Sequence, residues 1–196
     1  MSRNLFATRL YEAMIEDEHL LGELAYSIRS LADEDEAGKR WSRDKGYKGY
    51  TSYASLNDLP RRDPAFGDLK RVFSAHAVRF AKELAWEVRP KLDSIWANLL
   101  RAGGHHSAHI HPHSILSGTL YVEVPEGSGP IRFEDPRLPM MMAAPVRRDS
   151  APEDLQPFVA VQPRSGLLLM WESWLRHEVL PGTAKADRLS ISFNFS

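Results

Sequence analysis

Apolar residues recur every three or four positions in two stretches of the first ninety residues. The first stretch runs from Leu21 to Leu31 and the second from Phe66 to Val88, just before Pro90. This spacing is typical of one buried face of an α-helix, and a proline disfavours helical backbone in the residue before it. The pattern therefore predicts two amphipathic helices. The charged segment Asp33–Tyr53 between them predicts a solvated loop.

Beyond Pro90 the apolar runs shorten, and glycine-rich turn signals separate them. Runs of this length and spacing predict β-strands. We expect strands at Leu92–Leu99, Ala108–His113, Ser117–Val124, Ile131–Phe133, Phe158–Val161, Leu167–Trp171, His177–Leu180 and Arg188–Phe195. Many short strands in such a stretch favour a sandwich, a barrel or a jelly roll. The proline-rich segment Pro136–Pro157 interrupts them and predicts a long loop, either a lid over a binding site or a disordered excursion.

The last predicted strand alternates strictly between polar and apolar residues. One face carries Arg188, Ser190, Ser192 and Asn194, and the other carries Leu189, Ile191, Phe193 and Phe195. In one arrangement the polar face meets water. In the other, the apolar face packs against the two amphipathic helices and the polar face lines a cavity inside the sheets. The pattern alone leaves both arrangements open.

Composition limits the class of protein. Its 196 residues, 43% of them apolar, favour one domain with a substantial core. A formal net charge of −1 speaks against a nucleic-acid partner, and the absence of cysteine excludes disulfides, thiolate zinc sites and thiol catalysis. No apolar run is long enough to span a membrane, and the N-terminal segment turns acidic where a secretion signal would be apolar. We therefore expect a cytoplasmic protein with no membrane or nucleic-acid partner.

Histidines are concentrated at one place in the predicted sheet. Five of the eight lie within nine residues: His105, His106, His109, His111 and His113. Residues two apart on a strand point to the same side, so His109 and His111, or His111 and His113, can offer two imidazoles to one metal ion. His177 begins a later strand, and Arg188 follows it by 11 residues. A histidine cluster without function, or adventitious binding of zinc or nickel, is the other interpretation of this pattern.

Two histidines on an early strand, a third on a late strand and a following arginine suit one kind of metal chemistry. A non-haem iron enzyme needs three facial ligands and open positions for a cosubstrate and for oxygen. Where the cosubstrate is a dicarboxylic keto acid, the planar guanidinium of Arg188 suits its far carboxylate. Ser190 shares the face of Arg188 and can donate a second hydrogen bond to that carboxylate.

The segments HIHPHSILSGTLYVEVPEGSGPIRFEDPR and GLLLMWESWLRHEVLPGTAKADRLSISFN resemble a family of uncharacterised 2-oxoglutarate/Fe(II)-dependent oxygenases found in bacteria and marine phages. GYTSYASL and Trp96-Ala-Asn98 extend the resemblance over most of Gly49–Phe195. It implies a mainly β protein with N-terminal helices, folded as a double-stranded β-helix, which is a cupin-like jelly roll. It also implies His109, His111 and His177 as iron ligands, with Arg188, Ser190 and Asn98 binding 2-oxoglutarate, the first two at its distal carboxylate.

The sequence departs from most such oxygenases at His111, where an aspartate or glutamate is usual. Three neutral imidazoles keep open a three-histidine cupin dioxygenase that needs no 2-oxoglutarate, and His113 or Asp135 could also complete a ligand set. A non-catalytic cupin-type binding module is the remaining alternative. We expect one domain over residues 1–196, with residues 1–90 as helical support and residues 91–196 as the β-helix core.

The predicted function is an Fe(II)- and 2-oxoglutarate-dependent dioxygenase that hydroxylates a substrate and releases succinate and CO2. Its expected partners are small molecules, namely the cosubstrate and a prime substrate that the sequence does not identify. The oligomeric state stays open, and a homodimer is one assembly that the edges of a jelly roll allow.

Overall fold

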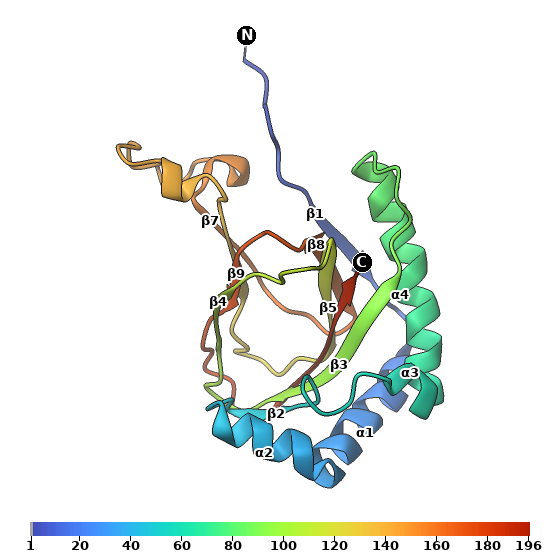
Figure 1. Ribbon diagram of the computed structural model, residues 1–196. Coiled ribbons are helices and arrows are strands. Elements are labelled where there is room, and N and C mark those ends of the chain that lie inside the picture. Colours follow the sequence, from blue (N-terminus) through green and yellow to red (C-terminus); the bar gives the residue numbers. More distant parts are fainter. Residues whose placement is uncertain (1) are drawn as a thin grey trace.

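Two facing antiparallel sheets form the centre of the computed structural model, which describes residues 2–196 (Figure 1). The larger sheet has the strand order β1 (Leu10–Met14), β8 (Leu167–Glu172), β5 (Leu116–Glu123), β10 (Arg188–Phe195), β3 (Leu92–Leu100) and β2 (Gly49–Thr51). The smaller sheet has the order β4 (His106–His109), β9 (His177–Val179), β6 (Ile131–Glu134) and β7 (Phe158–Val161). Neighbouring strands come from distant parts of the sequence, as in a jelly roll. The fold is a double-stranded β-helix, as predicted.

Helices cover the outer face of the larger sheet (Figure 1). They are α1 (Glu18–Glu34), α2 (Glu36–Asp44), α3 (Leu59–Arg62) and α4 (Pro64–Glu83). The side chain of Asp17 accepts a hydrogen bond from the backbone N–H of Leu20 and so caps α1, while Asp63 caps α4 through Ala65 N–H. Within residues 2–196, no helix combines the length and the apolar character that a membrane crossing needs.

Seven of the eight predicted strands lie within one residue of their expected bounds. The exception is β4, which was expected at Ala108–His113 and instead ends at His109. Pro112 has no N–H for a sheet ladder, and His113 has a φ of 70°, so the chain turns here instead of continuing as a strand. The short edge strands β1 and β2 were not predicted.

Two expectations for the helical half were wrong. The second amphipathic helix was expected to reach Val88, but α4 ends at Glu83, and Ala85 has a φ of 56° that a helix does not allow. The segment Asp33–Tyr53, expected to be a solvated loop, contains α2 and β2. The carboxylate of Asp35 caps α2 by accepting from Gly38 N–H, and it also accepts from the Tyr50 hydroxyl across the turn. Side-chain hydrogen bonds thus organise a segment that its charge alone suggested was unstructured.

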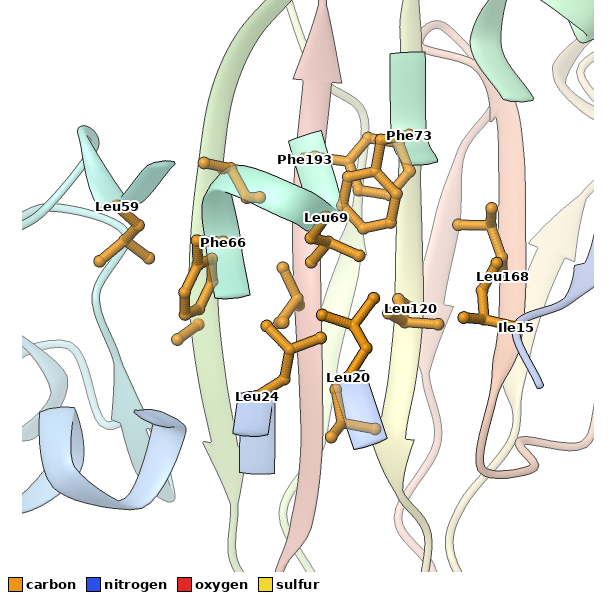
Figure 2. Close-up of a cluster of buried hydrophobic side chains, with 14 of the residues drawn as sticks. Ile15, Leu20, Leu24, Leu59, Phe66, Leu69, Phe73, Leu120, Leu168 and Phe193 are labelled. Carbon is orange, nitrogen blue, oxygen red and sulfur yellow. The ribbon is translucent and has the colours of Figure 1, made fainter. Parts of the chain in front are cut away.

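The main core lies between the helices and the larger sheet, as Figure 2 shows for residues such as Leu24, Leu69 and Leu120. The rings of Phe73 on α4 and Phe193 on β10 have centroids 4.0 Å apart. Gly118 makes this contact possible, because a Cβ there would lie 2.3 Å from the Phe193 ring. The apolar face of β10 therefore packs against the helices. Its polar face points between the two sheets, which confirms the second of the two arrangements that the alternation allowed.

Both halves of the chain contribute to this core. The buried cluster joins residues of α1 and α4 to residues of β3, β5, β8 and β10, and β1 and β2 of the first ninety residues extend the larger sheet. The Pro136–Pro157 segment contains two short 3-10 helices, Leu138–Met140 and Glu153–Leu155, and projects beyond the strands near the label of β7 in Figure 1. A role for it as a lid stays a prediction.

Candidate metal centre and cosubstrate pocket

Three histidines from two strands and one turn meet between the sheets. His109 ends β4 and is paired in register with His177, which begins β9, while His111 lies two residues beyond β4. One ligand nitrogen from each ring lies within 4.8 Å of the other two. The pairing of β4 with β9 is irregular between His106 and His109, so side chains do not alternate regularly between the two faces there. The irregularity lies just before the pair His109 and His111.

The hydrogen bonds of two rings leave one nitrogen of each free to bind a metal. His109 Nδ1 lies 2.7 Å from the carbonyl oxygen of Ser107, and His177 Nδ1 lies 2.9 Å from that of Leu175. A carbonyl only accepts, so each Nδ1 carries the proton and each Nε2 presents a lone pair. The Nε2 atoms of His111 and His177 lie 3.3 Å apart. A proton on Nδ1 and a free Nε2, as in His109 and His177, define the tautomer that metal-ligating histidines adopt when a backbone carbonyl orients them.

Burial keeps two of these imidazoles, those of His111 and His177, neutral. Burial, together with the neighbouring imidazoles, lowers the pKa of His177 to about 3, and the hydrogen bond to the Leu175 carbonyl opposes this only in part. Burial, with a contribution from His109, lowers the pKa of His111 to about 4. Neutral imidazole is the form that coordinates a metal, so neither ring must lose a proton at neutral pH before a metal binds.

Aromatic residues surround the rings. Trp171 packs edge-on against His177 with ring centroids 4.6 Å apart, and Phe133 lies 5.2 Å from Trp171. Trp96 approaches His111 from the opposite sheet at 6.1 Å. These side chains fix the orientation of the imidazoles and reduce the access of water to them.

Arg188 is the second notable feature of the interior. The residue is 5% exposed, Nη1 donates to the carbonyl oxygen of Gly129 at 3.0 Å, and the ring of Tyr121 lies 5.4 Å from the guanidinium carbon. Its Nε has no partner, and none of the ion pairs among residues 2–196 includes Arg188. A buried cation without a counter-charge is costly. The pocket is therefore suited to an anionic ligand.

Ser190 and Asn98 lie next to Arg188 on the inner face of the larger sheet. They are register partners across β10 and β3, and each is at most 5% exposed. Asn98 Nδ2 donates to Ser192 Oγ at 3.1 Å, whereas Asn98 Oδ1 is buried without a partner. The structure thus places all six predicted site residues on surfaces that face the space between the two sheets.

The sequence model of a family described as "Putative 2OG-Fe(II) oxygenase" matches residues 94–194, just over half of the chain. The chain belongs to this family of 2OG-Fe(II) oxygenases. As the description says, proteins of this family are oxygenases that use Fe(II) and 2-oxoglutarate. No curated protein sequence matches the chain.

Solved structures with the same fold include other oxygenases. A prolyl-4-hydroxylase of Pseudomonas putida has a TM-score of 0.60 and 17% identity over 96% of this chain and 92% of its own. The epimerase SnoN, solved in complex with Fe3+, alpha ketoglutarate and nogalamycin RO, has a TM-score of 0.68 and 16% identity over 96% of this chain and 79% of its own. A 2OG-Fe(II) oxygenase family protein of Burkholderia pseudomallei has a TM-score of 0.50 and 15% identity over 67% of this chain and 57% of its own. This oxygenase therefore spans little more than half of the Burkholderia protein.

The donor set of this oxygenase fits iron. Three neutral imidazoles with converging lone pairs suit a divalent iron ion, and the unpaired cation of Arg188 suits an acidic cosubstrate. The alternative ligands are less suited, because His113 is exposed and the Asp135 carboxylate is held by Arg137 at 2.7 Å. Of the other histidines in the cluster, His105 is exposed and His106 contacts Tyr47. Sequence reasoning missed that contact, since it treated the segment around Tyr47 as a loop.

Proposed function

We propose that His109, His111 and His177 hold the Fe(II) of this oxygenase. The observation that supports this most directly is the convergence of three ring nitrogens within 4.8 Å, with the protons of two rings bound by backbone carbonyls. When bound, the iron would supply the oxidising chemistry, in which O2 oxidises 2-oxoglutarate to succinate and CO2 and a C–H bond of the prime substrate to C–OH, with one oxygen atom going to each product. The protein binds and orients both molecules and excludes water around them.

Arg188 and Ser190 bind the distal carboxylate of 2-oxoglutarate in this proposal. Three neutral imidazoles leave the full double positive charge of the metal, and the guanidinium adds one more. A dianion matches such a pocket better than a neutral ligand does. The unpaired state of Arg188 favours this function over a three-histidine dioxygenase that needs no keto acid, because such an enzyme would bury a cation with nothing to bind.

Asn98 is proposed as a third contact to the cosubstrate. An amide turned by 180° exchanges its oxygen and nitrogen, and the two orientations differ only in their hydrogen bonds. In the turned orientation Ser192 donates to Asn98 Oδ1, so the buried oxygen gains a partner. Asn98 Nδ2 is then free to donate to a carboxylate oxygen of 2-oxoglutarate.

An anaerobic titration of the Fe(II)-loaded protein with 2-oxoglutarate tests the proposal. We expect a visible charge-transfer absorbance that saturates with cosubstrate and is absent in His177→Gln. His19→Gln is the matched control, because that side chain is 84% exposed and should leave the absorbance unchanged. Iron binding without any such absorbance in the wild type would favour the keto-acid-independent dioxygenase instead.

The cytoplasmic location, the lack of a nucleic-acid partner and a homodimeric state stay predictions. The near-neutral formal charge of −1 supports the second of these, since nucleic-acid binding requires a basic surface.

A further inference from the structure

Three aromatic side chains connect the histidine cluster with the surface of the protein. The ring of Trp96 lies 6.1 Å from that of His111, measured between centroids. Tyr53 meets Trp96 edge to face at 5.2 Å, and Trp41 lies 5.7 Å from Tyr53. Trp96 is 8% exposed, Trp41 is half-buried and Tyr53 is 56% exposed. These spacings are those of rings in contact, so the aromatic chain begins at a proposed metal ligand and ends in solvent.

Hydrogen bonds beside the rings fix the contact between Tyr53 and Trp96. Ser52 N–H donates to the Ala97 carbonyl at 3.0 Å, and Ala97 N–H donates to the Ser52 hydroxyl oxygen at 3.0 Å. Ser52 is the residue before Tyr53, and it is fully buried. Ala97 is the residue after Trp96 and is also fully buried. The two segments therefore cannot separate without breaking two buried hydrogen bonds.

The contact between Trp41 and Tyr53 is held in a similar way. Trp41 lies in α2, and the next residue, Ser42, is fully buried. The hydroxyl oxygen of Ser42 accepts a hydrogen bond from the backbone N–H of Thr51 at 3.1 Å. Because Thr51 is only two residues before Tyr53, this bond holds the outer end of the aromatic chain against the larger sheet.

The aromatic contacts of His177 lead away from solvent. Trp171 contacts His177, and Phe133 contacts Trp171 in turn. Trp171 is 2% exposed and Phe133 is 5% exposed. The benzyl ring of Phe133 is also much harder to oxidise than an indole or a phenol. Among the described residues 2–196, these contacts of His177 therefore end at buried rings, whereas the contact of His111 with Trp96 continues to the surface.

The chemistry of an oxygenase gives such a chain a use. A reaction that breaks a C–H bond of a substrate is also strong enough to remove an electron from indole or phenol. When 2-oxoglutarate is oxidised while no prime substrate is bound, one oxygen atom and two oxidising equivalents remain in a buried site. An enzyme must exclude the side reactions that this causes.

We propose that Trp96, Tyr53 and Trp41 form an electron-transfer chain that discharges the metal site after oxidation of 2-oxoglutarate without prime substrate. Trp96 gives an electron to the site, Tyr53 restores Trp96, and Trp41 or a one-electron reductant in solution restores Tyr53. The exposed hydroxyl of Tyr53 releases a proton to water when it is oxidised and regains one when it is reduced. Two electrons and two protons convert the remaining oxygen atom to water. This role rests on the proposed metal site and adds protection to the oxygenase activity.

Oxidation of the dye ABTS tests the chain. ABTS gives up one electron to form a green radical, and it is too large to reach a buried site. The Fe(II)-loaded protein is mixed with 2-oxoglutarate, O2, ABTS and catalase, without prime substrate. We expect up to two dye radicals for each succinate in the wild type. Trp96→Phe keeps a ring but not an oxidisable one, so most of the dye oxidation per succinate should be lost.

The matched control is Trp174→Phe, which removes a 48% exposed indole outside the chain and should leave the ratio of dye radical to succinate unchanged. Circular dichroism confirms that each variant folds. Rapid-freeze electron paramagnetic resonance without dye gives a second measurement. We expect an organic radical in the wild type, its loss in Trp96→Phe and a tryptophanyl signal without the tyrosyl one in Tyr53→Phe.

Three results would overturn the inference. One is an equal ratio of dye radical to succinate in the wild type and Trp96→Phe, because the electrons would then reach the site by another route. Another is succinate formation in the wild type without dye oxidation and without an organic radical. If the Fe(II)-loaded wild type forms no succinate at all, the proposed metal and cosubstrate site is wrong, and the electron-transfer chain is rejected with it.

Discussion

Replacement of Arg188 by methionine separates a binding role from a structural one. In the ligand-free protein the guanidinium has one hydrogen bond, to Gly129, and a cation–π contact with Tyr121. The hydrogen bond stabilises by about 1.5–3 kcal/mol and the contact by about 0.5–2 kcal/mol. Desolvation of the unpaired cation costs several kcal/mol in the opposite direction. We therefore expect Arg188→Met to change the free energy of unfolding by no more than about 2 kcal/mol in either direction.

The same substitution should abolish stabilisation by the cosubstrate. At a 2-oxoglutarate concentration of about 100 times Kd, binding stabilises the wild-type protein by about 3 kcal/mol. For a chain of this size that corresponds to a rise in Tm of roughly 5–10 °C. Loss of a charge-assisted pair raises Kd by about 100-fold or more, which leaves less than about 0.5 kcal/mol at the same concentration.

Differential scanning fluorimetry of the Mn(II)-loaded protein, with and without 2-oxoglutarate, measures both the stability of each variant without ligand and the rise in Tm that the cosubstrate causes. Arg164→Met is the matched control, because Arg164 is exposed and should leave the cosubstrate-induced shift intact. A shift in Arg188→Met equal to that of the wild type would refute the reasoning. So would a loss of more than about 3 kcal/mol without ligand, since that is the cost of breaking a buried ion pair that the interior does not contain.

Three further outcomes follow from the structure. Phe73→Ala removes a fully buried ring stacked on β10 and should cost about 3–5 kcal/mol in urea unfolding, whereas Tyr26→Ala, at a position 75% exposed, should cost less than about 0.5 kcal/mol. In metal-free protein, burial lowers the pKa of His106, His111 and His177, so the unfolded chain binds protons that the folded chain does not. Stability is therefore full above about pH 6.5, and each of these histidines lowers it by up to about 1.4 kcal/mol per pH unit as the pH drops below that value. Urea unfolding from pH 8 to pH 5 measures this, and a flat profile would contradict it. Trypsin should cut first at Arg147-Arg148, beside the 98% exposed Val146, and equal rates with and without metal and 2-oxoglutarate would count against a lid.

The strands were predictable because each carries its pattern locally. In β10 the alternation of polar and apolar residues is a property of the chain itself, and the observed bounds equal the predicted ones. Which face turns inward was not predictable from β10 alone. That depends on whether another element covers the apolar face, and the covering residue Phe73 lies 120 positions earlier in the sequence. Periodicity describes one segment, whereas packing is a relation between two.

His109 and His111 lie close together as predicted, although the strand that was expected to carry both of them ends at His109. Two imidazoles on one side of a strand were expected, yet His111 lies outside β4. The rings still converge, because the His111 N–H donates to the Ser173 carbonyl at 3.1 Å and so ties the turn to the segment just before β9. The sequence spacing predicted that the rings of His109 and His111 lie close together. In the structure, the hydrogen bond from His111 to the distant residue Ser173 holds His111 in that position.

The residues around Arg188 show where sequence reasoning stops. Gly129 and Tyr121 reach the guanidinium from two separate parts of the chain, and no local motif marks Gly129. A Cβ at Gly129 would lie 1.8 Å from the Leu180 carbonyl oxygen, so the close approach that lets its own carbonyl accept from Arg188 requires glycine. The interior of this oxygenase therefore has two ends, and the sequence identifies the residues of one end more completely than those of the other. The proposed metal end is recognisable from spacing because two of its three histidines, His109 and His177, sit on paired strands. At the proposed carboxylate end, by contrast, Gly129 and Tyr121 meet Arg188 only through contacts between distant segments.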